Sequence, residues 1–159
     1  MFFRGTRKDW NDNKGEGNRL RLKNIVDQKH PVGLLAYLDS EPVGWCAVAP
    51  RVDYDSLSRS KNHQAVDARN AWAITCFFTK TSARRKGVSS FLIQQAIIFS
   101  RSKGAEVLEA FPIIPRKEKV PDIYAYTGIS KVFINLGFYE VLNRDGMHPI
   151  MRYDLSKTN

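Results

Sequence analysis

The chain is poor in cysteine and histidine and has no long apolar run. Its 159 residues include two cysteines, Cys46 and Cys76, and three histidines. Each cysteine lies inside an apolar, strand-like run and the two form no close-spaced pair, so neither a disulfide framework nor a zinc site is expected. No apolar run approaches the roughly 20 residues of a membrane-spanning helix, and the first residues lack the apolar region of a secretory signal. The sequence therefore predicts a cytoplasmic protein without a metal and without a membrane partner.

Acidic side chains are also scarce. Lys and Arg number 25 against 16 Asp and Glu, which gives a formal charge of +9. A basic protein can bind nucleic acid, an anionic surface or a small polyanion such as a nucleotide cofactor. The cations are spread along the chain, without a long basic tail and without a zinc-finger or RNP-type signature. A nucleic-acid-binding function would rest on charge alone, so we expect no nucleic-acid partner.

The length and composition of the chain predict one domain, residues 1–159. Its apolar fraction of 43% is enough to close a core, and charged residues make up 26%. The polar stretch 51–70 is expected to form a long functional loop. Apolar periodicity and turn residues predict, in chain order, a short strand near Phe2, a helix from Asn18 that ends before Pro31, strands over 32–38, 43–49 and 71–79, a helix over 88–103, a strand over 106–113, a helix over 128–136, and strands over 138–143 and 149–155.

The segment Arg84-Arg85-Lys86-Gly87-Val88-Ser89 lies between a predicted central strand and the clearest predicted helix. Glycine lets the backbone turn sharply and approach a ligand without a Cβ atom in the way. The amides at a helix start lack intrahelical partners, and the helix dipole adds partial positive charge there. Such a turn binds phosphate oxygens, and flanking cations strengthen the binding. The spacing is neither that of a Walker loop nor that of a dinucleotide fingerprint.

In its context this segment resembles the coenzyme-binding motif of the GNAT superfamily of acyl-CoA-dependent N-acetyltransferases, Gln/Arg-x-x-Gly-x-Gly/Ala. Arg84 and Gly87 match the motif, whereas Ser89 stands where Gly or Ala is usual. The resemblance covers residues 18 to 155. Its further landmarks occur in the family's order: the hairpin 34–45 with Pro42-Val43-Gly44-Trp45, the strand end Phe77-Phe78-Thr79, and the helix 128–138 that ends in Gly137-Phe138.

The resemblance implies an α/β (α+β) fold, a single N-acetyltransferase domain over residues 1–159. The expected sheet is mixed and mostly antiparallel, with six or seven strands and helices on both faces. Two central strands, one ending at Thr79 and the other near Phe111, are expected to separate in a V-shaped split that receives the thioester. The implied activity is acetyl transfer from acetyl-CoA as cosubstrate.

The resemblance also implies how the coenzyme would be held. The main chain of Phe77, Phe78 and Thr79 would pair with the pantetheine arm like an added strand, and one of these N–H groups would stabilise the oxyanion. The backbone amides over 85–89 would hold the pyrophosphate, with Arg84 beside them. The implied coenzyme-binding residues are Phe77, Phe78, Thr79, Arg84, Arg85, Lys86, Gly87, Val88 and Ser89.

A departure from the family pattern falls at Phe133. Many relatives have a tyrosine there that protonates the departing thiolate, and phenylalanine has no proton to give. Tyr126 occupies a site where relatives often have a coenzyme-contacting asparagine, and Tyr124 is near it in sequence. Either tyrosine could be the acid, or solvent could, since a thiol has an unperturbed pKa of about 8.5. An equally good interpretation of both tyrosines is that they anchor a loop.

An amine substrate must lose a proton before it attacks, so a general base is needed. Glu109 is the first candidate, because a charged side chain within a predicted apolar strand suggests a function. The alternative is that its side chain faces solvent. The other candidates are Asp53, Asp55, His63 and His148. Histidines in loops are more often surface residues.

The predicted reaction is direct attack of a primary amine on acetyl-CoA in a ternary complex. A covalent route through Cys76 is disfavoured, because an apolar strand raises the pKa of a thiol. The alternative is a non-catalytic module that binds a CoA-like ligand or an acidic partner, which the phenylalanine at position 133 would favour. The expected acceptor is a small-molecule or peptide amine, and loops 51–70 and 114–126 are expected to shape its pocket. The net charge disfavours a polycation, although carboxylates in these loops could build an acidic pocket locally: Asp53, Asp55, Asp67, Glu118 and Asp122. A homodimer is compatible with the resemblance.

Overall fold

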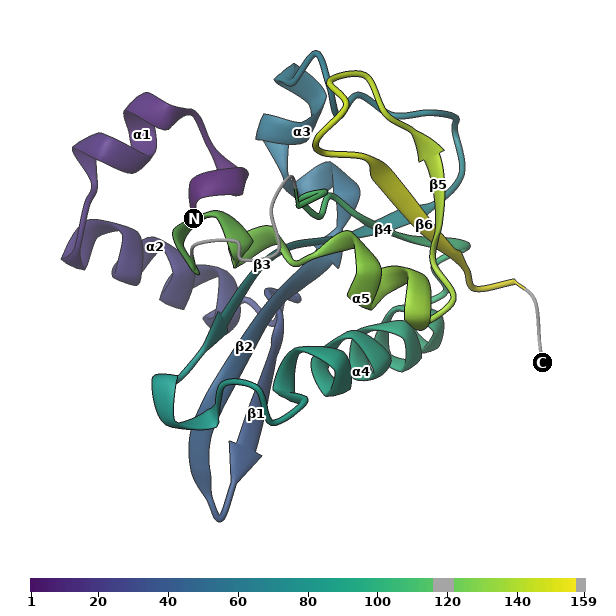
Figure 1. Ribbon diagram of the computed structural model, residues 1–159. Coiled ribbons are helices and arrows are strands. Elements are labelled where there is room, and N and C mark those ends of the chain that lie inside the picture. The colour runs from purple at the N-terminus through teal and green to yellow at the C-terminus, as the bar shows by residue number, and fades with distance from the viewer. Residues whose placement is uncertain (116–121, 157–159) are drawn as a thin grey trace.

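The computed structural model describes residues 1–115 and 122–156; for residues 122–124 it describes the backbone alone. Six strands and several helices form one body (Figure 1). The elements are η1 (Phe2–Arg4), α1 (Arg7–Asp12), α2 (Glu16–Asp27), β1 (Leu34–Leu38), β2 (Glu41–Pro50), η2 (Arg51–Asp53), α3 (Asp55–Arg59), β3 (Ala71–Thr79), η3 (Thr81–Ala83), α4 (Val88–Ser102), β4 (Val107–Ala110), η4 (Asp122–Thr127), α5 (Ser130–Asn135), β5 (Tyr139–Leu142) and β6 (Ile150–Asp154).

The sheet is mixed and mostly antiparallel. Its strand order is β1-β2-β3-β4-β6-β5. Among the six strands that the structure describes, the central β3–β4 pair is parallel and the other neighbouring pairs are antiparallel. A parallel pair needs a crossover connection, and α4 supplies it between β3 and β4. The expected mixed sheet, with six strands, is therefore confirmed.

The two central strands separate halfway along β3. The parallel register runs from Ala71↔Val107 to Ile74↔Ala110, and there it stops. β3 continues to Thr79 paired with β2 on its other edge. Within the part of the chain that the structure describes, the edge of β3 from Thr75 to Thr79 that faces away from β2 has no partner strand. The predicted V-shaped split is thus present at this edge.

An irregularity in β3 coincides with the start of the split. Ala47 pairs with Cys76 and Val48 pairs with Ile74, so Thr75 is an extra residue opposite β2. A bulge of this kind bends a strand and re-aims its side chains. The bend lies where β3 leaves β4, and it helps to open the sheet.

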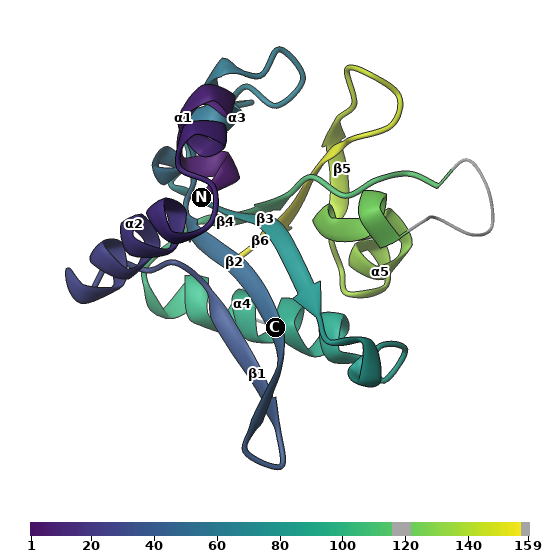
Figure 2. The same cartoon turned by 90° about the vertical axis from the view of Figure 1, so that its left-hand side faces the viewer.

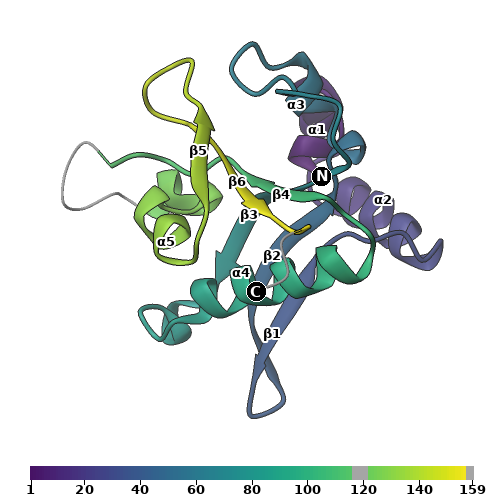
Figure 3. The ribbon, with the colours of Figure 1, turned by 90° about the vertical axis from the view of Figure 1, so that its right-hand side faces the viewer.

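Helices cover both faces of the sheet. In Figure 3 α4 crosses in front of β1 and β2, and in Figure 2 α1 and α2 lie on the opposite side. Apolar residues at three–four spacing bury one stripe of α4, including Leu92, Ile93 and Ala96. A second, smaller core around Tyr54, Leu57 and Phe111 fills the other face. Burial on both faces explains why β3 is apolar on both sides.

The N-terminal segment differs from its prediction. The expected strand near Phe2 is wrong, because Phe2–Arg4 form the 3₁₀ helix η1. Thr6 then starts α1 with a capping box to Asp9. The sequence Thr6-x-x-Asp9 carries this signal, but the helix has only six residues and no buried side chain. The predicted cap at Asn18 is also wrong, since α2 begins at Glu16 after Gly15.

Candidate active site

The glycine turn forms the start of α4 as predicted. Gly87 is its N-cap with φ +79°, and Arg85 also has a positive φ of +60°. The first intrahelical bond after this cap runs from the Phe91 N–H to the Gly87 carbonyl at 3.0 Å. The amides of Val88 and Ser89 precede that bond and have no intrahelical acceptor. A Cβ on Gly87 would have no atom within 4 Å, so the turn is open on its outer side.

Cations surround this turn. Arg84, Arg85 and Lys86 are all exposed, and the Arg84 Nε donates to the Thr79 carbonyl at 3.3 Å. The turn lines a pocket of about 210 Å³, called here the glycine-turn pocket. Its lining residues are Thr79, Ala83, Arg84, Arg85, Gly87, Val88, Ser89, Ser90 and Val132. Free amides, a helix N-terminus and cations therefore meet at one small hollow, which suits a polyanion.

The unpaired edge of β3 leads away from the glycine-turn pocket. Thr79 lines the pocket, and the edge runs back from there to Thr75. Of the predicted strand residues, Phe77 is buried against Phe133, whereas Phe78 is 61% exposed on the other face. Free backbone groups along this edge can accept an extended ligand as an added strand.

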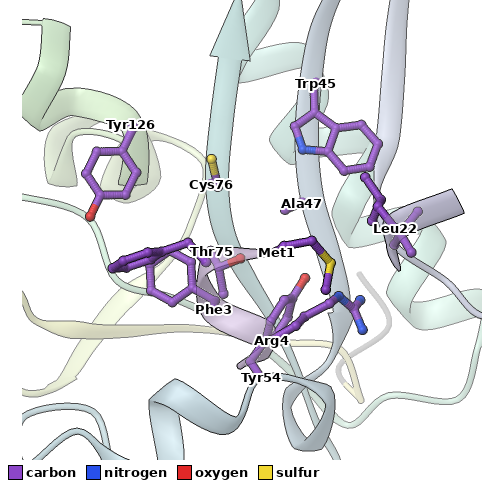
Figure 4. A pocket seen from close by; sticks show the side chains of 12 residues that line it. Met1, Phe3, Arg4, Leu22, Trp45, Ala47, Tyr54, Thr75, Cys76 and Tyr126 are labelled. Atoms are coloured by element: carbon purple, nitrogen blue, oxygen red, sulfur yellow. The ribbon is translucent and has the colours of Figure 1, made fainter. Parts of the chain in front are cut away.

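A second pocket, of about 280 Å³, lies at the opposite end of this edge and is called here the N-terminal pocket. In Figure 4 Tyr126 stands on one side and Trp45 with Leu22 on the other, with Met1 and Phe3 between them. It is lined by Met1, Phe2, Phe3, Arg4, Leu22, Val32, Trp45, Ala47, Tyr54, Thr75, Cys76 and Tyr126. Most of these side chains are apolar, and none is a carboxylate.

Arg4 and Tyr54 form the floor of the N-terminal pocket. The Arg4 Nη1 is 3.2 Å from Asp53 Oδ2, and its Nη2 donates to the Pro31 carbonyl at 3.0 Å. The guanidinium lies over the Tyr54 ring at 4.9 Å. Burial raises the pKa of Tyr54 to about 12, and its hydroxyl makes no hydrogen bond of normal geometry. Asp53, one of the predicted base candidates, is thus engaged by Arg4.

A third pocket, of about 360 Å³, adjoins the N-terminal pocket and is called here the histidine pocket. The two pockets share Phe2, Phe3 and Tyr126. The histidine pocket is lined by Phe2, Phe3, Asn62, His63, Phe111, Ile113, Tyr126, Thr127, Asp145 and His148. Phe111 follows β4, so this pocket lies on the β4 side of the split, and the N-terminal pocket lies on the β3 side.

Tyr126 lies at the junction of the two pockets. It belongs to η4, which packs against β3, and it is 42% exposed. Burial raises the pKa of its hydroxyl, with a smaller contribution from Cys76. A phenol that keeps its proton at neutral pH can donate it to a stronger base. Tyr124, the alternative acid, has its side chain outside the described part of the chain.

Phe133 is a core residue. It is fully buried, with ring centroids 6.1 Å from Phe77 and 5.1 Å from Phe138. The position where relatives have an acid is therefore occupied by an apolar ring that holds α5 against the sheet. Burial raises the pKa of both Cys46 and Cys76, which disfavours the thiolate form that a covalent route would need.

Glu109 lies in a buried ion cluster, and this position argues against its role as the base. Its side chain is fully buried on β4, where Oε1 accepts from Arg152 Nε at 2.9 Å and from Arg152 Nη2 at 2.8 Å. Its Oε2 accepts from Arg51. A proton acceptor needs a lone pair that faces the substrate, and here guanidinium groups occupy both oxygens. The alternative that Glu109 faces solvent is wrong.

This ion cluster ties the long loop 51–70 to the sheet. Arg152 also binds Asp67 with both terminal nitrogens, at 2.5 and 3.0 Å. Arg51 donates to the carbonyl of His63 as well as to Glu109. The loop is therefore fixed by charge-assisted hydrogen bonds, although it contains little regular structure.

The remaining base candidates lie in different places. Asp55 begins α3 and pairs with Arg59 at 3.7 Å on the surface. His63 and His148 come together in the histidine pocket, with ring centroids 6.4 Å apart. Of the other carboxylates considered for the acceptor site, Glu118 and the side chain of Asp122 lie outside the described residues. Asp145 was not among the residues predicted for the site, and the turn-forming context Asn143-Arg144-Asp145-Gly146 was the available signal for it.

The comparisons with known proteins agree with this geometry. The sequence profile of the acetyltransferase (GNAT) family matches residues 2–117, well over half of the chain. The chain belongs to the acetyltransferase (GNAT) family. As a member it is an acyltransferase, and the predicted fold and enzyme class are confirmed. No curated protein sequence matches this acetyltransferase at a significant level.

Solved structures show the same fold at low sequence identity. One acetyltransferase has a TM-score of 0.62 and 14% identity, covering 94% of this chain and 89% of its own. The PaiA N-acetyltransferase from Thermoplasma acidophilum, solved with coenzyme A, has a TM-score of 0.57 and 16% identity over 92% of this chain and 76% of that one. The ribosomal-protein-alanine N-acetyltransferase from Brucella melitensis has a TM-score of 0.54 and 16% identity over 87% and 77%.

The residues of this acetyltransferase fit the cosubstrate that the family implies. The open outer side of Gly87 leaves room for a close approach to the backbone, and the amides and cations around it suit a pyrophosphate. The unpaired edge of β3 from Thr75 to Thr79 suits an extended arm. Among residues 1–115 and 122–156 no group of three or more metal-binding side chains occurs, and no helix is long and apolar enough to cross a membrane.

Proposed function

We propose that the protein transfers an acetyl group from acetyl-CoA to a primary amine by direct attack in a ternary complex. The observation that carries this proposal is a linear arrangement along β3. The glycine-turn pocket lies at Thr79, and the unpaired edge runs from Thr79 to Thr75, which lines the N-terminal pocket. The histidine pocket adjoins the N-terminal pocket at Phe2, Phe3 and Tyr126. A coenzyme bound along this line would present its thioester where an acceptor can enter.

Each part of the line has a chemical task in this proposal. The amides after Gly87 hold the pyrophosphate, with Arg84, Arg85 and Lys86 around it. The main chain over 77–79 aligns the pantetheine arm, and a backbone N–H of this edge stabilises the oxyanion. The amine nitrogen bonds to the thioester carbon, the carbon–sulfur bond breaks, and Tyr126 or solvent protonates the thiolate.

The acceptor we propose has an apolar body next to its amine. The N-terminal pocket offers Leu22, Val32 and Trp45 as walls, and its charged lining side chain is Arg4. A cationic acceptor gains no ion pair from such a lining, so polyamines and aminoglycosides fit poorly. An aromatic or branched aliphatic amine, free or at the end of a peptide, gains from burial in this pocket.

Release of the CoA thiol from acetyl-CoA tests the proposal directly. Apolar primary amines, peptides with apolar N-terminal residues and polyamines would be compared at equal concentration. We expect thiol release with the first two groups and slower release with polyamines. Coenzyme binding without turnover for any amine would instead support the non-catalytic binding module. Strongly salt-dependent binding to nucleic acid, with CoA bound more weakly, would support the nucleic-acid alternative. A cytoplasmic location and a homodimer remain predictions.

A further inference from the structure

Two loops that are far apart in sequence meet at the rim of the histidine pocket. Arg144 Nη1 donates to the carbonyls of Asn62 and Gln64, at 2.9 and 3.4 Å. The Asn62 amide donates to Asp145 Oδ2 at 2.9 Å. The loop between β5 and β6 is therefore fastened to the loop that carries His63. Residues of both loops line the histidine pocket, and Tyr126 lines it as well.

Asp145 is held rigidly in this contact. Its Oδ1 accepts from the backbone N–H groups of Met147 at 2.8 Å and His148 at 2.7 Å. Burial disfavours its charge, but these two bonds and a bond to the His148 ring outweigh that effect and lower the pKa of Asp145 to about 2. Asp145 therefore stays ionised at any pH at which an enzyme of this kind is assayed.

The ionised carboxylate orients the His148 ring. His148 Nδ1 lies 3.0 Å from Asp145 Oδ2, so Nδ1 carries the hydrogen and donates it. The lone pair of the neutral ring is then on Nε2, which has no hydrogen-bond partner within residues 1–115 and 122–156. The side chain is 37% exposed and lines the histidine pocket. A ring whose one nitrogen is fixed by a carboxylate and whose other nitrogen is free is arranged to accept a proton.

The other titratable groups around His148 do not compete with it. His63 stands edge-to-face to it at 6.4 Å, and burial lowers the pKa of His63, so its ring is neutral near pH 7. The His63 Nε2–H donates to the His148 carbonyl at 3.3 Å, and its Nδ1 is 3.3 Å from Ser60 Oγ. Both nitrogens of His63 are thus engaged. Arg144 binds backbone carbonyls, and Tyr126 faces the same pocket as a protonated phenol.

We propose that His148 is the general base of the acetyl transfer and that Asp145 is its positioning residue. This inference rests on the proposed function above. The acceptor arrives as an ammonium ion, and Nε2 of His148 takes one proton from it, directly or through one water. The neutral amine attacks the thioester carbon, and the thiolate leaves. After the attack the nitrogen loses a second proton, and the departing thiolate gains one to become the CoA thiol. The imidazolium of His148 returns the first proton to solvent.

Steady-state kinetics across pH test the assignment with variants His148→Gln and Asp145→Asn. We expect kcat/KM for an alkylamine at neutral pH to fall on the order of a hundredfold in His148→Gln, the usual scale of general-base catalysis. In Asp145→Asn we expect a smaller decrease of kcat/KM, because the His148 ring is still present but is no longer oriented by a carboxylate. His30→Gln is the control, since His30 is exposed and distant in sequence from both loops, and it should match the wild type.

A second acceptor separates a base from a merely structural residue. An arylamine arrives already neutral at neutral pH and needs no base before attack. The loss in His148→Gln should therefore be at least tenfold smaller with an arylamine than with an alkylamine, and acetyl-CoA affinity by calorimetry should equal that of the wild type. An equal loss with both amines, or wild-type kcat/KM with the alkylamine, overturns the assignment of His148. A wild-type protein that binds acetyl-CoA but turns over no amine overturns the proposed function and this assignment together.

Discussion

A Cβ atom placed on Gly44 would lie 2.6 Å from Cγ1 of Val88, the first residue of α4. The next contacts would be Leu92 Cδ1 at 3.1 Å and Ala36 Cβ at 3.4 Å. Gly44 on β2 therefore lets the start of α4 approach the sheet closely. The helix start that presents the candidate phosphate-binding amides is positioned by a residue more than forty positions earlier in the chain.

Gly44→Ala should consequently disturb both stability and coenzyme binding. An added methyl group in a closely packed contact typically costs about 1–3 kcal/mol of unfolding free energy. Because the displaced neighbour is Val88, we also expect weaker acetyl-CoA binding by calorimetry. Gly5→Ala is the matched control, since its Cβ would have ordinary contacts at 3.6 Å with Asp9. Normal coenzyme affinity in Gly44→Ala would show that α4 need not be held so close.

Gly87 and Gly104 provide a matched pair at the two ends of α4. Their φ angles are +79° and +77°, and a Cβ on either would have no atom within 4 Å. Alanine at either position should cost about 1–2 kcal/mol of backbone strain. Only Gly87→Ala should also weaken acetyl-CoA binding, because its methyl group occupies the open side of the turn. Equal affinities in the two variants would contradict a coenzyme site at this turn.

The cations of the turn should act on the coenzyme through solvent. Arg84 and Lys86 are exposed, so their attraction to a pyrophosphate is screened by salt. The double variant Arg84→Ala/Lys86→Ala should bind acetyl-CoA more weakly and show a smaller decrease of affinity with rising salt than the wild type. The control is the double variant Lys8→Ala/Lys23→Ala. Lys8 pairs with Asp12 within α1 and Lys23 pairs with Asp27 within α2, so neither lysine belongs to the turn before α4. The same salt dependence in all three proteins would place the coenzyme elsewhere.

Tyr126 can be tested as the acid by two substitutions. If its hydroxyl protonates the thiolate, Tyr126→Phe lowers kcat with little change in acetyl-CoA affinity, because only a transition-state interaction is lost. We expect a decrease on the order of tenfold to a hundredfold. If the ring only packs at the junction of the two pockets, phenylalanine is nearly silent and Tyr126→Ala raises KM. Wild-type kcat in Tyr126→Phe would leave solvent as the proton source.

The low pKa of Asp145 predicts how stability depends on pH. Its folded-state pKa of about 2 lies below the ordinary value of 3.8. The stabilisation from its ionised form is fully present above pH 3.8 and is lost as the pH falls through 2. Asp145→Asn should therefore be less stable than the wild type in urea unfolding at neutral pH, and the difference should shrink toward pH 2. A difference that does not change with pH would mean that the carboxylate is not held as an anion.

The sequence by itself determined the elements around the coenzyme site. Strand β3 has the bounds predicted from its apolar run, 71–79, and α4 begins at Val88 directly after the glycine. These signals are local: an apolar strand, a residue that permits positive φ, and a stripe at helical spacing. The hairpin of β1 and β2 was predictable for the same reason, because its turn lies between two apolar runs.

Only the tertiary structure decided which side chains meet on the acceptor side. Glu109 was expected at the substrate because of its place in a strand, but two arginines from distant segments, Arg51 and Arg152, engage it in the core. His63 and His148 are 85 positions apart and come together because the two loops that carry them are hydrogen-bonded to each other. The hydrophobic period fixes which face of an element is buried, whereas the pairing of loops depends on sheet order and on long-range ion pairs, which leave no local pattern in the sequence.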